Sequence, residues 1–114
     1  MPRTPRSAPE QRGAATTLIL LILRDRPSYG YELVREIRRR SQEMFNFAEG
    51  TIYPLLYGLE EDGSIVGSWD GDAGGRRRRV YRLTPAGRQL LKQRLDAWEH
   101  FALAMRTSLL APKS

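Results

Sequence analysis

Apolar residues recur along the first half of the chain at the spacing of a helix. Residues 14–24 are apolar on nearly every side, which predicts a short helix buried on more than one face. Residues 29–40 carry apolar side chains on one face and predict a second helix, with Ser28 as its N-cap. Residues 50–62 repeat apolar side chains at i, i+3, i+4 and i+7, which predicts a third helix that ends at Gly63.

The period of the pattern changes after the third predicted helix. In residues 65–69 and 81–83, apolar residues alternate with polar or small ones, which is typical of two strands. Residues 70–75 between them are rich in Gly and Asp and predict the turn of a β-hairpin. Thr84 is a suitable N-cap for a last helix over 85–110, whose first residue is proline.

The last predicted helix carries an apolar stripe at alternating intervals of four and three residues, the pattern of a coiled-coil seam. The stripe is more apolar surface than so small a domain can cover, so we expect a homodimer. In the alternative, the stripe packs only on the core of its own chain. The expected dimer interface is Leu91, Leu95, Trp98, Ala102, Met105 and Leu109.

The order of these elements is typical of a winged helix-turn-helix protein. The expected fold class is mainly α with a two-stranded β-wing, followed by a long C-terminal dimerisation helix. In such a fold the third helix enters the major groove of DNA and the wing lies along a neighbouring groove or the backbone. The expected parts are a flexible basic N-terminal tail (1–13), a winged helix-turn-helix DNA-binding domain (14–84), a dimerisation helix (85–110) and a tail (111–114).

The charge of the chain favours a polyanionic partner. Lys and Arg number 19 against 13 Asp and Glu in 114 residues, a formal charge of +6. Adjacent arginines repel one another, and DNA phosphates would balance that repulsion, so we expect the arginines of the wing to contact DNA. The alternative is a solvated strand edge that resists aggregation. The arginines concerned are Arg76, Arg77, Arg78 and Arg79.

Two further groups are candidates for DNA contact. Arg38 and Arg39 lie near the end of the second helix, where they would either bind phosphates or stabilise the helix dipole. Thr51 and Tyr53 lie on the third helix, and the Tyr53 ring points away from its apolar face. We expect Tyr53 near DNA; in the alternative it packs on the second helix.

The residue types exclude most enzyme chemistry. The chain has no Cys and a single His, His100, which removes thiol nucleophiles, Cys-based metal sites and His-based triads. We therefore expect no catalytic residues, no metal site and no cofactor. The longest apolar run, 18–23, is far shorter than the roughly 20 residues that span a bilayer, and with no disulfide-forming residue a cytoplasmic protein is expected.

Three ordered motifs resemble those of the PadR-like transcriptional regulators. They are PSYGYEL at 27–33, GTIYP at 50–54 with LEEDG at 59–63, and GRRRRVYRLT at 75–84. The resemblance covers about residues 15–110. It implies a homodimeric repressor on an inverted-repeat operator, with the third helix and wing on DNA and the last helix in the dimer interface.

The resemblance also implies a small-molecule site. In the small members of the family, which lack a second C-terminal domain, aromatic or drug-like ligands can bind between the protomers. Some of those members place a stacking tryptophan where this chain has Trp98, which implies a slot lined by Leu18, Trp98 and Phe101. In the alternative, Trp98 only anchors the seam. Gly58 stands where the family commonly has Arg or Lys, so DNA affinity should depend more on the wing.

The sequence therefore predicts a DNA-binding regulator of transcription that reads a specific sequence as a homodimer and is released by a small ligand. The alternative function is a small-molecule sensing or adaptor module whose hydrophobic dimer cleft is the main functional site. Non-specific packaging of DNA would need only the positive charge, and it would give equal affinity for all sequences.

Overall fold

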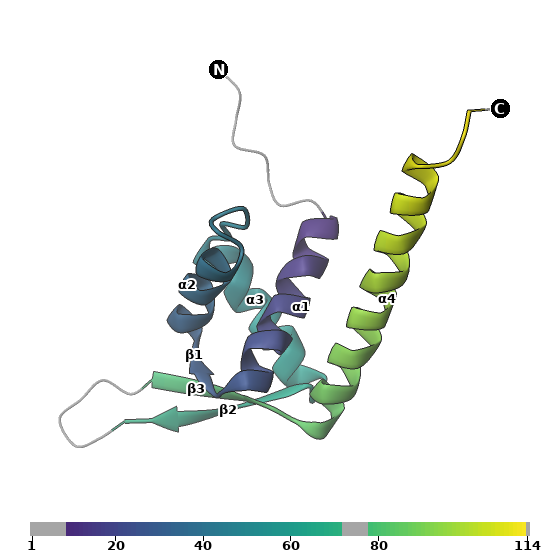
Figure 1. Cartoon of the computed structure of the whole chain (residues 1–114). Coiled ribbons are helices and arrows are strands. Elements are labelled where there is room, and N and C mark those ends of the chain that lie inside the picture. The colour runs from purple at the N-terminus through teal and green to yellow at the C-terminus, as the bar shows by residue number, and fades with distance from the viewer. Residues whose placement is uncertain (1–8, 72–77, 114) are drawn as a thin grey trace.

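The predicted fold class is confirmed in the computed structural model, which describes residues 9–71 and 78–113. Figure 1 shows α1, α2 and α3 standing on a small sheet, with α4 beside α1 and extending past it. The chain is a mainly helical winged helix-turn-helix with a long C-terminal helix. Its elements are α1 (Pro9–Asp25), β1 (Ser28–Tyr29), α2 (Gly30–Arg40), α3 (Glu49–Glu61), β2 (Ile65–Asp70), β3 (Arg78–Leu83) and α4 (Pro85–Leu109).

Helix α1 begins earlier than the sequence predicted. Residues 9–13, which were expected in a flexible tail, are helical, and Pro9 suits a helix start because the first position needs no N–H. The beginning of α1 lies against α4, where Arg94 Nη1 donates a hydrogen bond of 3.3 Å to the carbonyl oxygen of Gly13. This long-range contact holds the helix to α4 at Gly13, one residue before the apolar pattern begins. Residues 1–8 of the expected tail lie outside the described residues.

The sheet has three antiparallel strands in the order β1-β3-β2, one more than the sequence predicted. Ser28, the expected N-cap of α2, instead lies in β1 opposite Tyr81 and is buried. The N-cap is Tyr29, whose backbone N–H donates to Glu32 Oε1 at 2.9 Å. The prediction of Ser28 as N-cap was wrong because its backbone pairs with a strand that lies far away in sequence.

Other predicted helix ends are confirmed. Gly63 follows α3 with a φ of 82°, the left-handed conformation that glycine adopts without strain. Thr84 caps α4, since its Oγ1 accepts a hydrogen bond of 3.0 Å from the backbone N–H of Gly87. These end signals are local, and for that reason the sequence alone sufficed to place them.

The core lies between α1, the helix pair α2–α3, the sheet and the base of α4. Phe45 and Phe47 attach the 41–48 loop to it, with ring centroids 5.6 Å apart. Helix α1 supplies five of the buried apolar residues, in agreement with its apolar character on nearly every side. The buried set is Ala15, Ile19, Leu20, Ile22, Leu23, Leu33, Ile37, Phe47, Ile52, Leu56, Leu59, Ile65, Tyr81 and Leu91.

The apolar stripe of α4 is covered by its own chain only near the base of the helix. Leu91 is buried and Leu95 packs against the core. Beyond that point the stripe emerges into solvent, where Trp98, Met105 and Leu109 are 63%, 51% and 79% exposed. The alternative in which the stripe packs entirely on its own core is therefore wrong for this upper half.

Candidate nucleic-acid interface

A cavity of about 640 Å³ lies where the start of α2, helix α3 and the wing, formed by β2 and β3, meet. All five tyrosines of the chain line it, although they come from four different elements. The sequence did not predict this cluster of tyrosines, because their spacing along the chain does not indicate that they meet in space. We call it the tyrosine groove; its lining is Tyr29, Gly30, Tyr31, Tyr53, Tyr57, Tyr81, Arg78 and Arg79.

Tyr53 forms the wall of the groove between α3 and α2. Its ring lies so close to Gly30 that a β-carbon there would come within 2.8 Å of the Tyr53 hydroxyl oxygen. Burial raises the pKa of this hydroxyl. The structure therefore places Tyr53 against the second helix, the alternative position, with its side chain half-buried and still facing the groove. Thr51, two residues earlier on α3, is also half-buried.

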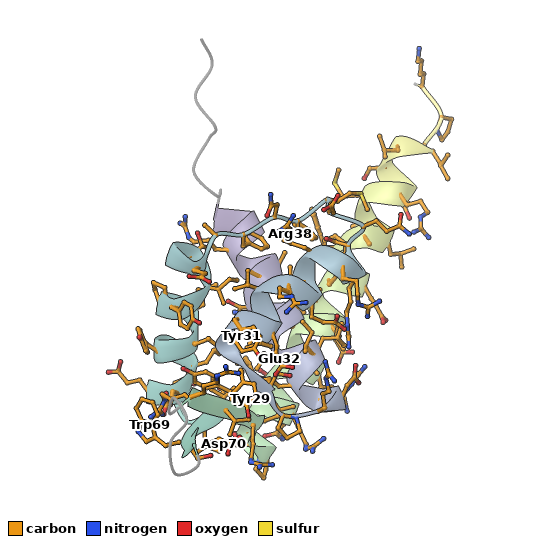
Figure 2. All side chains as sticks on the ribbon, turned by 90° about the vertical axis from the view of Figure 1, so that its left-hand side faces the viewer. Tyr29, Tyr31, Glu32, Arg38, Trp69 and Asp70 are labelled. Atoms are coloured by element: carbon orange, nitrogen blue, oxygen red, sulfur yellow. The ribbon has the colours of Figure 1, made fainter. Side chains whose placement is uncertain are left out.

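Arg78 lies over two parallel tyrosine rings at the open side of the groove. Its guanidinium carbon is 5.8 Å from the Tyr29 ring centroid and 5.5 Å from that of Tyr31, and Nη1 donates to the Tyr31 hydroxyl at 3.3 Å. The Tyr29 hydroxyl donates a hydrogen bond to Asp70, and this bond raises the pKa of Tyr29. Figure 2 shows Tyr29 and Asp70 together at the wing, with Tyr31 and Glu32 beside them at the start of α2.

Arg79 occupies a different setting from its neighbour. Its Nη2 donates to Glu60 of α3, and its guanidinium carbon lies 5.3 Å from the ring centroid of Trp69. The side chain is 28% exposed, whereas residue Arg78 is exposed. The remaining wing arginines that the sequence singled out, Arg76 and Arg77, lie outside the described residues.

The arginines at the end of α2 belong to an ion-pair network. Arg39 makes two hydrogen bonds to Glu36, of 2.6 and 2.8 Å, and Arg38 lies 3.3 Å from Glu43. The hydrogen bond from Arg39, supported by Arg40, lowers the pKa of Glu36 to about 2. Arg40 also reaches Asp25 at 2.7 Å and so ties α2 to the end of α1. Part of this cluster is therefore structural, although the Arg39 side chain remains 71% exposed.

Replacing Glu36 by Gln is expected to lower the free energy of unfolding at pH 7 by about 2 kcal/mol. Glu36 titrates near pH 2 in the folded chain against an ordinary value of 4.5, so its contribution is complete above pH 4.5 and is lost as the pH falls toward 2. Urea unfolding at several pH values should therefore show the two proteins converging in acid. Glu43→Gln, at a side chain 76% exposed, should change stability by less than about 0.5 kcal/mol. Parallel curves for wild type and Glu36→Gln would contradict this.

The residues of the expected ligand slot do not all meet within one chain. Trp98 and Phe101 pack edge to face, with ring centroids 5.9 Å apart. Leu18 is half-buried against the core. Helices α1 and α4 run antiparallel, and Gly13 of α1 lies at the level of Arg94 of α4. Leu18 therefore lies nearer the base of α4, whereas Trp98 lies farther from that base.

The described residues hold no group of three or more His, Cys, Asp or Glu side chains placed to bind a metal ion. Among the helices of residues 9–71 and 78–113, none has the length and apolar character to cross a membrane.

Comparison with known proteins gives consistent matches. Residues 19–93 match the model of the PadR-like family of transcriptional regulators. A transcriptional regulator of Mycobacterium tuberculosis is 40% identical over 92 residues, which are 81% of this chain and 82% of that protein. The solved structure of a transcriptional regulator from Clostridium thermocellum has a TM-score of 0.81 at 32% identity. The match covers 90% of this chain and 97% of that protein. A PadR family regulator from Eggerthella lenta has a TM-score of 0.79 at 29% identity, and the match covers 90% of this chain and 88% of that protein.

Proposed function

Because the chain belongs to the PadR-like family of transcriptional regulators, which bind DNA and are not enzymes, we propose that it is a repressor that binds an inverted-repeat operator as a homodimer. The observation that carries this proposal is the meeting of α3, the start of α2 and Arg78 of the wing around the tyrosine groove. Aromatic rings, hydroxyl groups and an exposed guanidinium suit the sugar-phosphate backbone of DNA. A regulator of transcription works where the DNA is, which supports a cytoplasmic location.

The assignment of DNA contacts follows from exposure and charge. Arg78 is exposed and has no carboxylate partner among the described residues, so we assign it to a phosphate. We also assign Arg39 to the backbone, because its side chain is 71% exposed despite its ion pair. Tyr57, 61% exposed, and Thr51 are the α3 side chains we place nearest the bases. Arg76 and Arg77 are assigned to phosphates on charge alone.

The homodimer is proposed from the exposed upper stripe of α4. A monomer seldom leaves a contiguous row of large apolar side chains in water, whereas a second copy would bury the row symmetrically. Dimeric readers of this fold place two recognition helices in half-sites about one turn of DNA apart. The proposed interface is therefore also the part that sets the spacing of the two recognition helices.

The protein is expected to bind the DNA upstream of its own gene at least about a hundredfold more tightly than random DNA of equal length at about 150 mM salt. The reason is that base contacts from α3 add to a backbone affinity that both fragments share. A band-shift titration with both fragments measures the ratio. Equal affinities would contradict a specific operator and would favour non-specific packaging of DNA.

Release by a ligand is proposed from the exposed Trp98–Phe101 pair, which a second protomer would convert into a covered aromatic slot near Leu18 of one of the two chains. Planar aromatic molecules are expected to quench Trp98 fluorescence by stacking and to weaken operator binding. The matched control is Trp98→Phe, which keeps an aromatic ring in the seam and leaves Trp69 as the remaining fluorophore. Quenching of equal size in that variant would show that the slot is not the site. Quenching with unchanged operator affinity would favour the sensing or adaptor module.

A further inference from the structure

The ion pair between Arg79 and Glu60 joins the outer part of the wing to the last turn of α3. The Arg79 side chain is 28% exposed and that of Glu60 is 29% exposed, so both charges are largely withdrawn from water. The Arg79 guanidinium also lies 5.3 Å from the ring centroid of Trp69 and 5.9 Å from that of Tyr81. Trp69 lies directly opposite Arg79 on β2. Arg79 is thus held by both strands of the wing and by α3.

The path of the Arg79 side chain to Glu60 depends on the absence of a side chain at Gly67. Gly67 lies on β2 two residues before Trp69, and therefore on the same face of the strand. A β-carbon at Gly67 would come within 2.9 Å of Arg79 Nε and closer still to Nη2. The guanidinium therefore passes over Gly67 to reach Glu60. Because the conflict is with the charged end of Arg79, alanine at this position would displace that end from its path.

Adjacent wing arginines therefore differ in their electrostatics. Arg78 is exposed and lies over tyrosine rings, so its positive charge is available to a phosphate. The charge of Arg79 is balanced by Glu60 at hydrogen-bond distance. A phosphate that approached Arg79 would have to share the guanidinium with a carboxylate already in place. The gain in charge neutralisation is therefore smaller than at Arg78, which is exposed.

We propose that Arg79 is a positioning residue for DNA recognition: with Glu60 it fixes the angle between the wing and α3, and it does not itself bind a phosphate. The inference rests on the proposed function, because it concerns how two DNA-contacting elements are aligned. It differs from the expectation, drawn from the run of four arginines, that all of them contact DNA. The orientation of the wing then depends on Glu60 of α3, the helix that is proposed to read the bases.

The first test needs no DNA. Amide hydrogen exchange of the full chain is expected to rise at least about tenfold at residues 66–70 and 78–80 in Arg79→Ala and in Gly67→Ala, and to stay unchanged in Arg78→Ala. If Arg79→Ala does not fold, Gly67→Ala serves instead, because it leaves both charges in place. Unchanged exchange in the folded variants would overturn the proposal. This measurement decides the matter even if the protein binds no specific operator.

The second test separates alignment from phosphate contact by titrating salt. Arg78→Ala is expected to reduce the slope of log affinity against log salt by about one, as loss of one phosphate contact requires. Arg79→Ala is expected to lower operator affinity about tenfold with the slope unchanged. A slope reduced by about one in Arg79→Ala would make it a phosphate ligand and overturn the proposal.

A charge exchange completes the design. Arg79→Glu alone is expected to bind operator weakly, and adding Glu60→Arg is expected to restore most of the lost affinity, since the pair reforms with its polarity reversed. Failure of the folded double variant to recover any affinity would contradict a role through Glu60. Random DNA serves as the control, because alignment of wing and α3 matters less where no base sequence is read.

Discussion

Replacing Met105 and Leu109 together by glutamate is expected to leave the protein monomeric and to reduce operator affinity at least about a hundredfold. Both side chains are exposed on α4 in the isolated chain, at 51% and 79%, so the change should not disturb the fold of the monomer. In the proposed dimer it would bury four like charges in an apolar seam without partners. Once the subunits separate, the two half-sites are no longer bound by one particle.

Light scattering or sedimentation gives the mass, and a band shift on the same samples gives the affinity. The matched control is Thr107→Glu, which adds a charge to the same turn of α4 on the face opposite the stripe. This control is expected to remain dimeric and to bind DNA within about twofold of wild type, the small loss reflecting repulsion from phosphates. A double variant that stays dimeric would place the interface elsewhere on the molecule.

Replacing Gly87 by Ala is expected to lower the free energy of unfolding by about 3 kcal/mol, enough to threaten so small a domain. Gly87 lies in the first turn of α4, and an added β-carbon would come within 2.7 Å of Leu83 Cδ1 and even closer to the carbonyl oxygen of Ser64. That carbonyl cannot move easily, because it accepts hydrogen bonds of 3.1 and 2.9 Å from the backbone and hydroxyl of Thr84. Either α4 or the start of β2 would have to shift.

The matched control is Gly58→Ala, in the exposed middle of α3. A β-carbon there meets no atom within 4 Å, so alanine should raise stability by up to about 1 kcal/mol through its higher helix propensity. Denaturant unfolding of the three proteins measures both effects. Equal midpoints for Gly87→Ala and wild type would show that the contact between α4 and Ser64 is not close in solution.

The distribution of positive charge is more restricted than the net charge suggests. Among the described arginines, Arg38, Arg39, Arg40 and Arg79 all have carboxylate partners in their own chain. Part of the basic character thus holds α1 to α2 and the wing to α3. The arginine most available to DNA is Arg78, which is positioned by tyrosine rings instead of by a carboxylate.

Long-range packing gives two of the predicted DNA-contact residues partners that the sequence did not show. Tyr53 was expected near DNA, which stays a prediction, and its ring packs on Gly30 while it faces the groove. Arg79 was grouped with its neighbours in a basic run, and its partner Glu60 is nineteen residues away. In both cases the partner belongs to another element, so no local pattern could have identified it.

The sequence by itself determined the features that depend on residues only a few positions apart. The periods of α2, α3 and α4, the turn at Gly63, the Thr84 cap and the apolar stripe of α4 are all of this kind, because backbone geometry repeats over short intervals. The order of these elements then indicated a winged helix-turn-helix, and the family motifs added the resemblance to PadR-like regulators.

The tertiary structure alone decided the features that join distant segments. Strand β1 exists because the backbone of Ser28 pairs with Tyr81, and α1 contacts α4 through the hydrogen bond from Arg94 to Gly13. The tyrosine groove collects rings from four elements, and Glu60 meets Arg79 over Gly67. Such contacts depend on how the helices and the sheet pack in three dimensions, and packing joins residues that no spacing along the chain relates.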